Sequence, residues 1–288
     1  MDQPLVSVII TTYNRETYLE QALESVAKQT YPNIEMVVVD DGSQIRYAEP
    51  ICGSYTNCHY HYKENGGVSS ARNFGVAQAS GSFIAFLDDD DLWKEDKIEK
   101  QVQLLLDHPG IDLIHSAAVV VNQNNEPTGD IIGASISKAH KRSGYVFWNA
   151  LAVWTVKAST PLIRKSIFRD TFFFDERLKA GEDSDFYQRV FYKHKIRYME
   201  EPTTFYRVYE SDQRLSMQGH LYEGVEPIMF ENFKRMNISN PLVMYKIARR
   251  ILRLAMRNWN QRNPKKSLKI SKFDLLFRPW RCLEKFER

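Results

Sequence analysis

The sequence predicts an α/β fold: a mostly parallel central sheet flanked by helices, followed by a basic helical extension at the C-terminal end. Short apolar runs alternate with segments of helical periodicity, which is typical of a doubly wound sheet. Polar loops follow several of these runs directly, at the edge where such sheets bind ligands. Charge sets the extension apart, because residues 241–288 carry 14 Lys and Arg against 3 Asp and Glu, a net charge of +11.

The composition is that of a globular chain with a sizeable core. Of the 288 residues, 43% are hydrophobic and 12% are aromatic. No run of roughly 18 apolar residues occurs, and residues 1–4 lack the basic start of a signal peptide. Three cysteines do not form the pattern of a disulfide framework. We therefore expect a cytoplasmic protein.

Strands and helices alternate in the first part of the chain. Four runs predict strands: residues 5–10, 34–39, 60–63 and 82–87. Two segments between them have apolar residues at helical spacing: 18–26 and 68–78. Each of three polar segments follows a strand, so we expect them together at the carboxyl edge of the sheet: 11–15, 40–43 and 88–91.

The later part of the chain is less regular. Helices are expected over residues 94–108 and 186–193. Strands are expected over four segments: 111–121, 159–164, 196–199 and 203–208. Residues 122–145 predict a loop or hairpin, and the apolar segment 147–156 fits either a helix or a strand.

Four consecutive carboxylates, Asp88 to Asp91, follow the strand at residues 82–87. Adjacent anions repel one another, and a divalent cation among them relieves the repulsion. A strand that delivers Asp-x-Asp to a loop therefore predicts a metal that bridges the protein and a phosphorylated ligand. The alternative is an acidic turn that caps a helix starting near Leu92, since Asp is also favoured at helix N-termini.

Two further acidic groups accompany this run: Asp40 and Asp41 after a strand, and residues 182–185 before a helix. A nucleotide pocket can use such groups in three ways. One Asp accepts a hydrogen bond from a base, Asp-x-Asp holds Mn²⁺ or Mg²⁺ against a diphosphate, and another carboxylate deprotonates an acceptor hydroxyl.

Five motifs now carry a family resemblance. They occur in the order VSVIITTYNR (residues 6–15), VDDGS (39–43), NGGVSSARN (65–73), AFLDDDD (85–91) and GEDSD (181–185). The chain thereby resembles the family-2 inverting glycosyltransferases of the GT-A fold, which has a Rossmann-like sheet, over about residues 4–210. The resemblance implies a catalytic domain at 1–220 and a helical basic extension at 221–288. Within the domain, it implies a nucleotide-sugar-binding half at 1–120 and an acceptor-binding half at 121–220.

The resemblance also implies roles for residues on the nucleotide side. Thr11 and Tyr13 would line the base pocket, and Asp41 would accept a hydrogen bond from the base. Arg72 would face the nucleotide and its phosphates. Simpler alternatives stay open, because Asp40 and Asp41 could make a turn with Gly42 and Arg72 could be a surface cation on a helix.

On the reacting side, the resemblance implies that Asp88 and Asp89 contact the ribose and order the metal site. It implies that Asp90 binds the metal and that Asp183 is the catalytic base. The alternative for Asp183 is an ordinary charge at a helix N-terminus. Tyr209 stands where the family often has a His, so we assign no His ligand there.

The implied reaction is an inverting, Mn²⁺- or Mg²⁺-dependent transfer of a sugar from a nucleotide-sugar, with a UDP-sugar as the implied donor. The acceptor would be a hydroxyl of a glycan or lipid-linked saccharide in polysaccharide biosynthesis. Two other functions stay open: a nucleotidyltransferase, although residues 11–15 lack a Lys-bearing phosphate loop, and a degenerate nucleotide-sugar-binding scaffold at the membrane. Trp148 and Trp154 suit either an acceptor sugar or core packing.

The extension predicts an amphipathic helix at residues 242–260, with an apolar stripe of Ile247, Ile251, Leu254 and Ala255. Residues 264–288 interleave Lys and Arg with Phe, Leu and Trp, which suits an anionic membrane surface. We therefore expect peripheral binding to the inner face of a membrane. The alternative is that the helix packs on the catalytic domain. No nucleic-acid partner is expected, because no recognised binding motif accompanies the charge.

Overall fold

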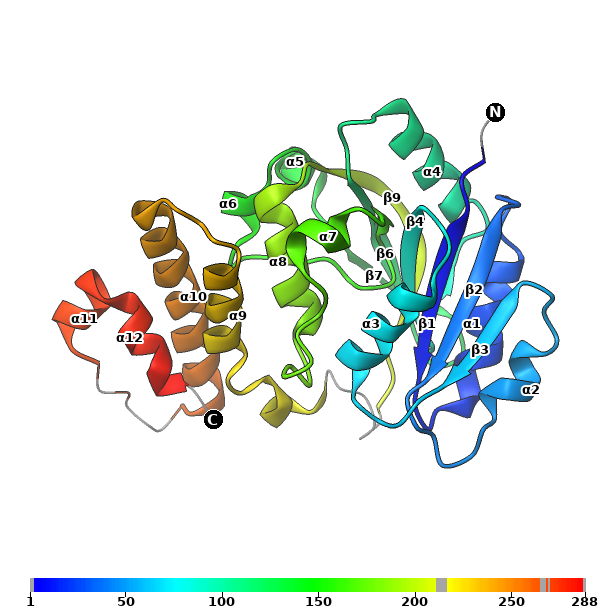
Figure 1. Ribbon diagram of the computed structural model, residues 1–288, viewed down its shortest axis with the longest axis horizontal. Coiled ribbons are helices and arrows are strands. Elements are labelled where there is room, and N and C mark those ends of the chain that lie inside the picture. Colours follow the sequence, from blue (N-terminus) through cyan, green and yellow to red (C-terminus); the bar gives the residue numbers. More distant parts are fainter. Residues whose placement is uncertain (1–2, 211–216, 265–267, 269, 287–288) are drawn as a thin grey trace.

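The computed structural model describes residues 3–210, 217–264, 268 and 270–286, and it shows a curled sheet between layers of helices (Figure 1). The strand order in the sheet is β3-β2-β1-β4-β8-β6-β9-β5, and β7 pairs with β6. Strands β1 to β4 are mutually parallel, whereas β8 runs antiparallel to β4 and β6. The predicted α/β class with a mostly parallel sheet is confirmed.

The parallel register brings three strand ends together. Thr11 of β1 pairs with Asp88 of β4, and Thr12 pairs with Asp40 of β2. The polar segments that follow these strands therefore meet at one edge of the sheet. The strand bounds are β1 Val6–Thr12, β2 Ile34–Asp40, β3 Cys58–Tyr62, β4 Phe83–Asp88, β5 Leu92–Trp93, β6 Leu113–Val121, β7 Pro127–Ile132, β8 Leu162–Arg164 and β9 Ile196–Arg207.

Both faces of the sheet are covered, which explains why its central strands are apolar at successive positions. Val8 and Val38 pack toward α1 and α4, whereas Ile9 and Val37 pack toward α3 and α8. The helix bounds are α1 Glu16–Ala27, α2 Ala48–Cys52, α3 Val68–Gln78, α4 Lys97–Asp107, α5 Ile136–Ala139, α6 Phe147–Ala150, α7 Ile167–Thr171, α8 Glu182–Lys193, α9 Val225–Arg235, α10 Pro241–Arg262, α11 Lys272–Phe277 and α12 Pro279–Leu283.

Several predicted elements need correction. No helix starts near Leu92, because Leu92 and Trp93 form β5, which pairs with β9. The two expected last strands are one strand, β9, which crosses residues 200–202 and pairs with β6 on both sides of a register shift. The hairpin expected within residues 122–145 is present, because β7 pairs antiparallel with β6, and α5 follows it. In the segment 147–156, which fitted either a helix or a strand, the start is helical.

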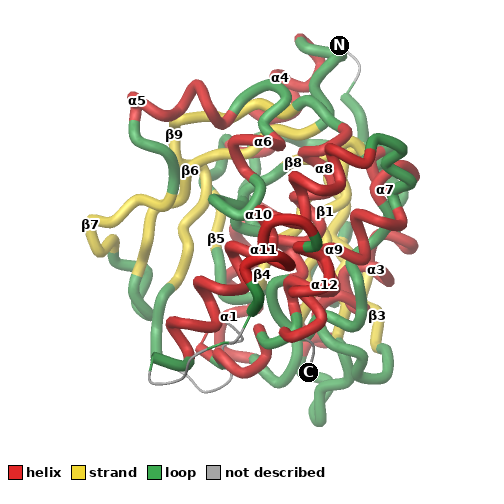
Figure 2. The backbone as a smooth tube through the Cα atoms, turned by 90° about the vertical axis from the view of Figure 1, so that its left-hand side faces the viewer, coloured by secondary structure: helices red, strands yellow, loops and turns green. Residues whose placement is uncertain are grey.

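The C-terminal helices join the molecule through α9, which packs against α8, while α10 and α12 pack on α9. Figure 2 shows α9 to α12 in front of the strands when the molecule is viewed from that side. On α10, Ile247, Ile251 and Ala255 are buried as predicted, but Leu254 is only half-buried and Leu252 is buried instead. This helix therefore uses its apolar stripe for packing on α9 and the core around α8.

Beyond α10, the apolar side chains face outward. Phe273, Leu276, Phe277 and Trp280 are exposed on α11 and α12, and their neighbours Lys272, Arg278 and Arg281 are exposed too. In the part of the chain described, none of the helices combines the length and apolar character needed to cross a bilayer.

Candidate functional site

A cavity of about 620 Å³ opens at the carboxyl edge of the parallel strands. The loops after β1, β2 and β4 line one side, and the N-terminal turn of α8 lines another. The structure brings every predicted site residue into the lining of this one cavity: Thr11, Tyr13, Asp41, Arg72, Asp88, Asp89, Asp90 and Asp183. Strands and helices separated by up to 172 positions in the sequence therefore converge here.

On the nucleotide side, Tyr13 is half exposed within the lining, whereas Asp41 is buried. Both carboxylate oxygens of Asp41 are engaged, since Oδ1 accepts from Lys63 Nζ at 2.7 Å and Oδ2 accepts from the Gly67 amide at 2.7 Å. The Gly66 amide and the Asn65 side chain also donate to Asp41. A carboxylate has about four acceptor positions, and these four donors fill them. The base of a nucleotide could therefore bind Asp41 only by replacing one of the four donors.

The turn alternative applies to Asp40 rather than to Asp41. Asp40 Oδ1 accepts a hydrogen bond from the Ser43 amide at 2.8 Å, as in a tight turn. Gly42 has a φ of 85°, and a Cβ there would lie 2.7 Å from the Asn65 amide nitrogen. The turn therefore requires glycine so that the loop before α3 can lie against Asp41.

Arg72 is not a surface cation, because it is only 3% exposed. Its guanidinium bridges Asp88 Oδ1 at 2.7 Å and Glu182 Oε1 at 2.5 Å. Burial alone would lower the pKa of Arg72, but the two carboxylates outweigh burial and raise it. This arginine thus ties the end of β4 to the first turn of α8, across the floor of the cavity.

The four consecutive carboxylates point in different directions. Asp91 turns inward, where it accepts from Ser159 Oγ at 2.6 Å and from the Arg207 amide at 3.0 Å. Asp89 accepts from Thr12 Oγ1 at 2.6 Å and from Arg15 at 2.8 Å. Burial raises the pKa of Asp91 and raises the pKa of Asp89 to about 7.

Asp90, the predicted metal ligand, lines the cavity and contacts two neighbouring side chains. Its Oδ2 lies 2.8 Å from Arg15 Nη1 and accepts from the Tyr209 hydroxyl at 3.0 Å. Tyr209, which replaces the expected His, therefore reaches the predicted metal ligand. Within the described residues, no three His, Cys, Asp or Glu side chains converge to hold a metal. The donor set still fits Mg²⁺ or Mn²⁺, because such ions often combine one or two carboxylates with substrate phosphates and water.

Asp183 lies in the first turn of α8. The helix begins at Glu182, directly after Gly181, which has a φ of 76° and ends the preceding loop. Burial raises the pKa of Asp183, and the nearby cations of Arg72 and Lys157 oppose that effect. Asp183 also accepts a hydrogen bond from the Ser184 amide at 2.6 Å. Asp183 therefore has the helix N-terminal position of the simpler alternative, and it also lines the cavity, where a base would have to lie.

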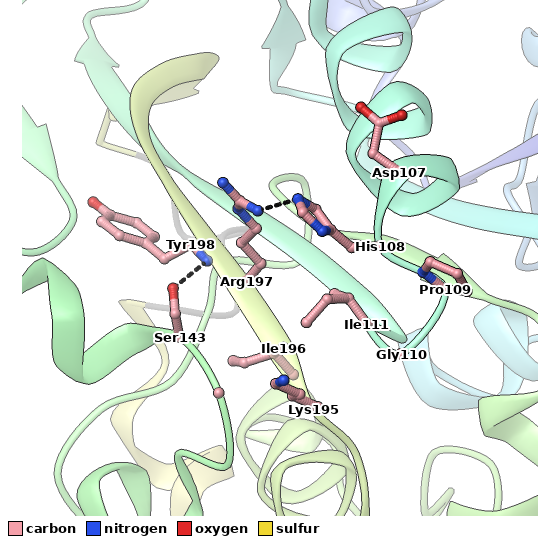
Figure 3. A pocket seen from close by; sticks show the side chains of 11 residues that line it. Asp107, His108, Pro109, Gly110, Ile111, Ser143, Lys195, Ile196, Arg197 and Tyr198 are labelled. Atoms are coloured by element: carbon pink, nitrogen blue, oxygen red, sulfur yellow. Dashed lines mark hydrogen bonds between the residues drawn. The ribbon is translucent and has the colours of Figure 1, made fainter.

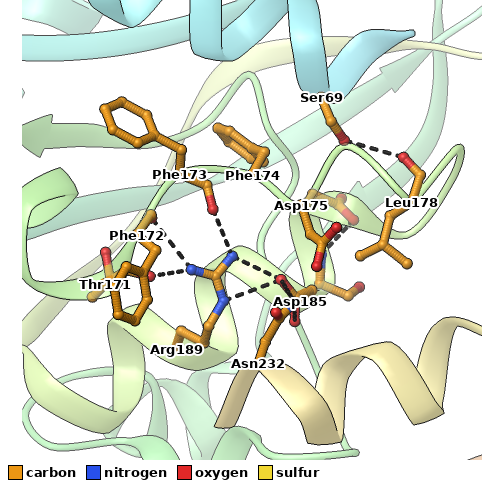
Figure 4. Close-up of polar contacts among 12 residues, drawn as sticks. Ser69, Thr171, Phe172, Phe173, Phe174, Asp175, Leu178, Asp185, Arg189 and Asn232 are labelled. Carbon is orange, nitrogen blue, oxygen red and sulfur yellow. Dashed lines mark hydrogen bonds and ion pairs between the residues drawn. The ribbon is translucent and has the colours of Figure 1, made fainter. Parts of the chain in front are cut away.

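A buried network around Asp185 and Arg189 holds α8, the helix that carries Asp183 (Figure 4). Arg189 pairs with Asp185 at 2.7 Å, and it donates to the backbone carbonyls of Thr171 and Phe173. Asn232 of α9 donates to the same Asp185 carboxylate at 3.1 Å. Helix α9 is therefore hydrogen-bonded to the helix that carries Asp183.

Sequence reasoning left several lining residues without a role. Arg15 belongs to the motif at residues 6–15, and its position in the polar loop after the first strand was the available signal that it could line the cavity. Lys157 and Lys179 come from loops and Tyr222 from a short 3-10 helix, and their approach to the cavity had no sequence signal.

The two tryptophans of the expected acceptor side do not line the cavity. Trp154 packs between His115 and Phe191, as the core-packing alternative predicted. Trp148 contacts Phe147, and the Arg250 guanidinium lies 5.5 Å from its ring.

A second cavity, of about 660 Å³, lies beside the first residues of β6 and β9 (Figure 3). Because these strands run parallel to β1 and β4, this cavity is at the opposite edge of the sheet from Asp90. Arg197 contacts His108 there, and the Tyr198 amide donates to Ser143 at 3.0 Å. None of the predicted site residues reaches it.

Comparison with known proteins shows the family of the chain. Residues 7–172, more than half of the chain, match the family described as Glycosyl transferase family 2. The chain belongs to this family. An uncharacterized family relative from Rickettsia typhi, named as a glycosyltransferase, is 31% identical over 208 residues, which cover 67% of this chain and 62% of the relative. GgaB of Bacillus subtilis, a minor teichoic acid biosynthesis protein, is 32% identical over 219 residues.

This family 2 chain spans less than two thirds of the length of either relative, since the match covers only 23% of GgaB. Solved structures share its fold. TarS of S. aureus in complex with UDP-GlcNAc matches with a TM-score of 0.71 at 21% identity, over 97% of this chain and 79% of that one. A mannosyltransferase from Pyrobaculum calidifontis, solved with GDP-Man and Mn²⁺, matches with a TM-score of 0.60 at 16% identity, over 99% and 84%.

Proposed function

We propose that this family 2 protein is an inverting glycosyltransferase, which moves a sugar from a nucleotide-sugar to a hydroxyl of a glycan or lipid-linked acceptor. One observation carries the proposal: the carboxylates Asp41, Asp90 and Asp183, from three distant segments, line a single cavity. A degenerate binding scaffold would not need the half-buried carboxylate of Asp183 in the same cavity as the acidic loop. A nucleotidyltransferase would want a phosphate-binding Lys in the loop after β1, where Tyr13 and Arg15 stand instead.

Asp183 is proposed as the general base. Burial raises its pKa, which makes the carboxylate a better proton acceptor near neutral pH. In the proposed step, the acceptor oxygen forms a bond to the anomeric carbon while the bond from that carbon to the diphosphate oxygen breaks. The hydroxyl proton passes to Asp183, and the nucleoside diphosphate leaves with the bonding electron pair. Attack opposite the leaving group inverts the anomeric configuration.

A divalent cation held by Asp90 would neutralise negative charge on the departing diphosphate. Mn²⁺ and Mg²⁺ are the proposed ions, and the Pyrobaculum structure with GDP-Man and Mn²⁺ supports this choice by analogy of fold. On the donor, the complex of TarS with UDP-GlcNAc makes UDP-sugars the first class to test, and UDP-GlcNAc the first member.

We place the acceptor in cell-envelope polysaccharide assembly, supported by the teichoic acid relative GgaB. An anionic membrane surface is the proposed partner of α11 and α12, where Phe277 and Trp280 are exposed beside Arg278 and Arg281. The apolar stripe of α10 takes no part in this proposal, because it is buried against α9.

Calorimetric titration of UDP, GDP, dTDP and CMP, each with and without Mn²⁺, tests the donor site. We expect one nucleotide to bind in a Mn²⁺-dependent manner, and we expect Asp90→Ala to abolish that dependence. The matching nucleotide-sugar should then be consumed by wild type and release its nucleoside diphosphate. If a nucleotide binds but the matching nucleotide-sugar is not consumed, the scaffold function replaces the transferase, and if no nucleotide binds, the proposed donor site is wrong.

A further inference from the structure

We propose that Arg15 is an internal counter-ion that competes with the divalent cation for Asp90, so that the cation binds strongly only together with a nucleoside diphosphate. The inference rests on the proposed cation dependence and adds an order to it. The diphosphate first draws Arg15 from the acidic loop, and the cation then takes its place.

The geometry places one nitrogen between two carboxylates. Arg15 Nη1 lies 2.8 Å from Asp89 Oδ1 and 2.8 Å from Asp90 Oδ2. A cation bound to the same Asp90 oxygen would lie about 2.0–2.6 Å from it. Two positive groups would then be only a few ångströms apart, where their repulsion is strong in a partly buried site. Arg15 and a divalent ion therefore exclude each other from Asp90.

The surroundings allow the Arg15 side chain to leave while its backbone stays. The Arg15 amide donates to the Tyr47 hydroxyl at 2.9 Å, which holds the chain just before α1. Asp89 keeps its bond from Thr12 Oγ1, and Asp90 keeps its bond from the Tyr209 hydroxyl. Neither carboxylate would thus lose its last donor when the guanidinium moves.

A diphosphate is the ligand chemistry that would attract the freed guanidinium. Arg15 lines the cavity beside Tyr13, and its side chain is 20% exposed, so a ligand can reach it. Guanidinium groups bind phosphate oxygens through paired, charge-assisted hydrogen bonds. One movement would therefore clear the cation position and add a positive contact to the leaving group.

This arrangement couples the two ligands. Nucleoside diphosphate should increase the affinity for Mn²⁺, and Mn²⁺ should increase the affinity for the nucleotide by the same factor. Part of that coupling is direct, because the phosphates themselves bind the ion. The part that belongs to Arg15 is removed by a neutral side chain at position 15.

The test measures Mn²⁺ binding to the full chain in the absence of nucleotide. The EPR signal of free Mn²⁺ reports how much of the ion remains unbound. We expect Arg15→Gln to bind Mn²⁺ at least about tenfold more tightly than wild type. Arg15→Lys retains the positive charge and should stay close to wild type. Arg177→Gln is the matched control, because Arg177 also pairs with two carboxylates, Asp175 and Glu231, but lies outside the cavity.

Equal Mn²⁺ affinity of wild type and Arg15→Gln without nucleotide would overturn the inference, and so would equally tight binding by Arg15→Gln and Arg15→Lys. Arg15→Met takes the place of Arg15→Gln if thermal melting shows that the latter does not fold. A parallel titration with UDP separates the two proposals. Wild type that binds Mn²⁺ with UDP keeps the cation site even if Arg15 proves irrelevant, whereas no Mn²⁺ binding under any condition refutes both.

Discussion

Replacing Asp183 with Asn should abolish transfer while leaving the fold and the donor site intact. The amide has the shape of the carboxylate, and its oxygen can still accept the Ser184 amide, which donates at 2.6 Å. Among the described residues, no cation forms an ion pair with Asp183, so the substitution strands no buried charge. Because burial disfavours the charged form of this side chain, we expect the unfolding free energy to change by less than about 1 kcal/mol.

The catalytic loss should be large by comparison. A positioned general base contributes roughly 10²- to 10⁴-fold, equivalent to about 3–5 kcal/mol of the activation barrier. Initial rates of nucleoside diphosphate release in the presence of acceptor give kcat, and calorimetry gives the donor Kd. We expect kcat to fall by at least about a hundredfold and Kd to stay within about twofold.

The neighbouring carboxylate provides the contrast. Glu182 pairs with Arg72 at 2.5 Å, and both side chains are buried. Glu182→Gln weakens that pair, and breaking a buried pair costs about 3–5 kcal/mol when no other partner remains. Arg72 keeps Asp88, so we expect a loss of about 2 kcal/mol in urea unfolding. If Asp183→Asn retains more than about a tenth of the wild-type rate, or loses activity through the donor Kd, then Asp183 is not the base.

Three further outcomes follow from the same contacts. Arg72→Lys should lower the unfolding free energy by about 2–4 kcal/mol and weaken UDP binding, since an ammonium cannot bridge Asp88 and Glu182 together; unchanged melting would contradict this. Burial raises the pKa of Asp89 to about 7, so the folded protein binds more protons than the unfolded chain between about pH 4 and 7. The free energy of unfolding, measured in urea without nucleotide, should therefore fall as the pH rises through this window. An increase with pH would contradict the prediction. Phe277→Glu combined with Trp280→Glu should reduce co-sedimentation with anionic vesicles at least about tenfold, whereas the exposed control Ile131→Glu should not. Equal vesicle binding by the double variant and wild type would rule out α11 and α12 as the membrane-binding surface.

Much of the site could be predicted because its signals are local. A buried parallel strand has a recognisable run of apolar residues, and the residues that follow it must emerge at the carboxyl edge of the sheet. Thr11, Asp41 and Asp88 each come within two positions of such a run, so their convergence follows from the strand pattern. The helix at residues 68–78 matches its predicted bounds, because its apolar spacing and the preceding Gly66-Gly67 are both local features.

Other features depended on contacts between segments far apart in the chain. Leu92 and Trp93 favour a strand only because β9 lies beside them, and the tertiary pairing overrides the helix signal of the preceding Asp residues. The apolar stripe of α10 looked equally suited to a membrane, and only the presence of α9 and α8 decided that it packs inward. Periodicity gives the direction of an apolar face but not the partner that covers it.

By itself, the sequence determined the α/β class and the convergence of the loops after the parallel strands, Asp90 among them, because strand periodicity and polar strand ends are properties of neighbouring residues. Asp183 lies in the first turn of a helix, and its place in the same site followed only from the family resemblance. Only the tertiary structure decided that Arg72 is buried between two carboxylates, that Arg15 lies on the acidic loop, and that Asp91 turns inward. Those outcomes depend on burial and on charges brought together from distant segments, and a linear pattern contains neither.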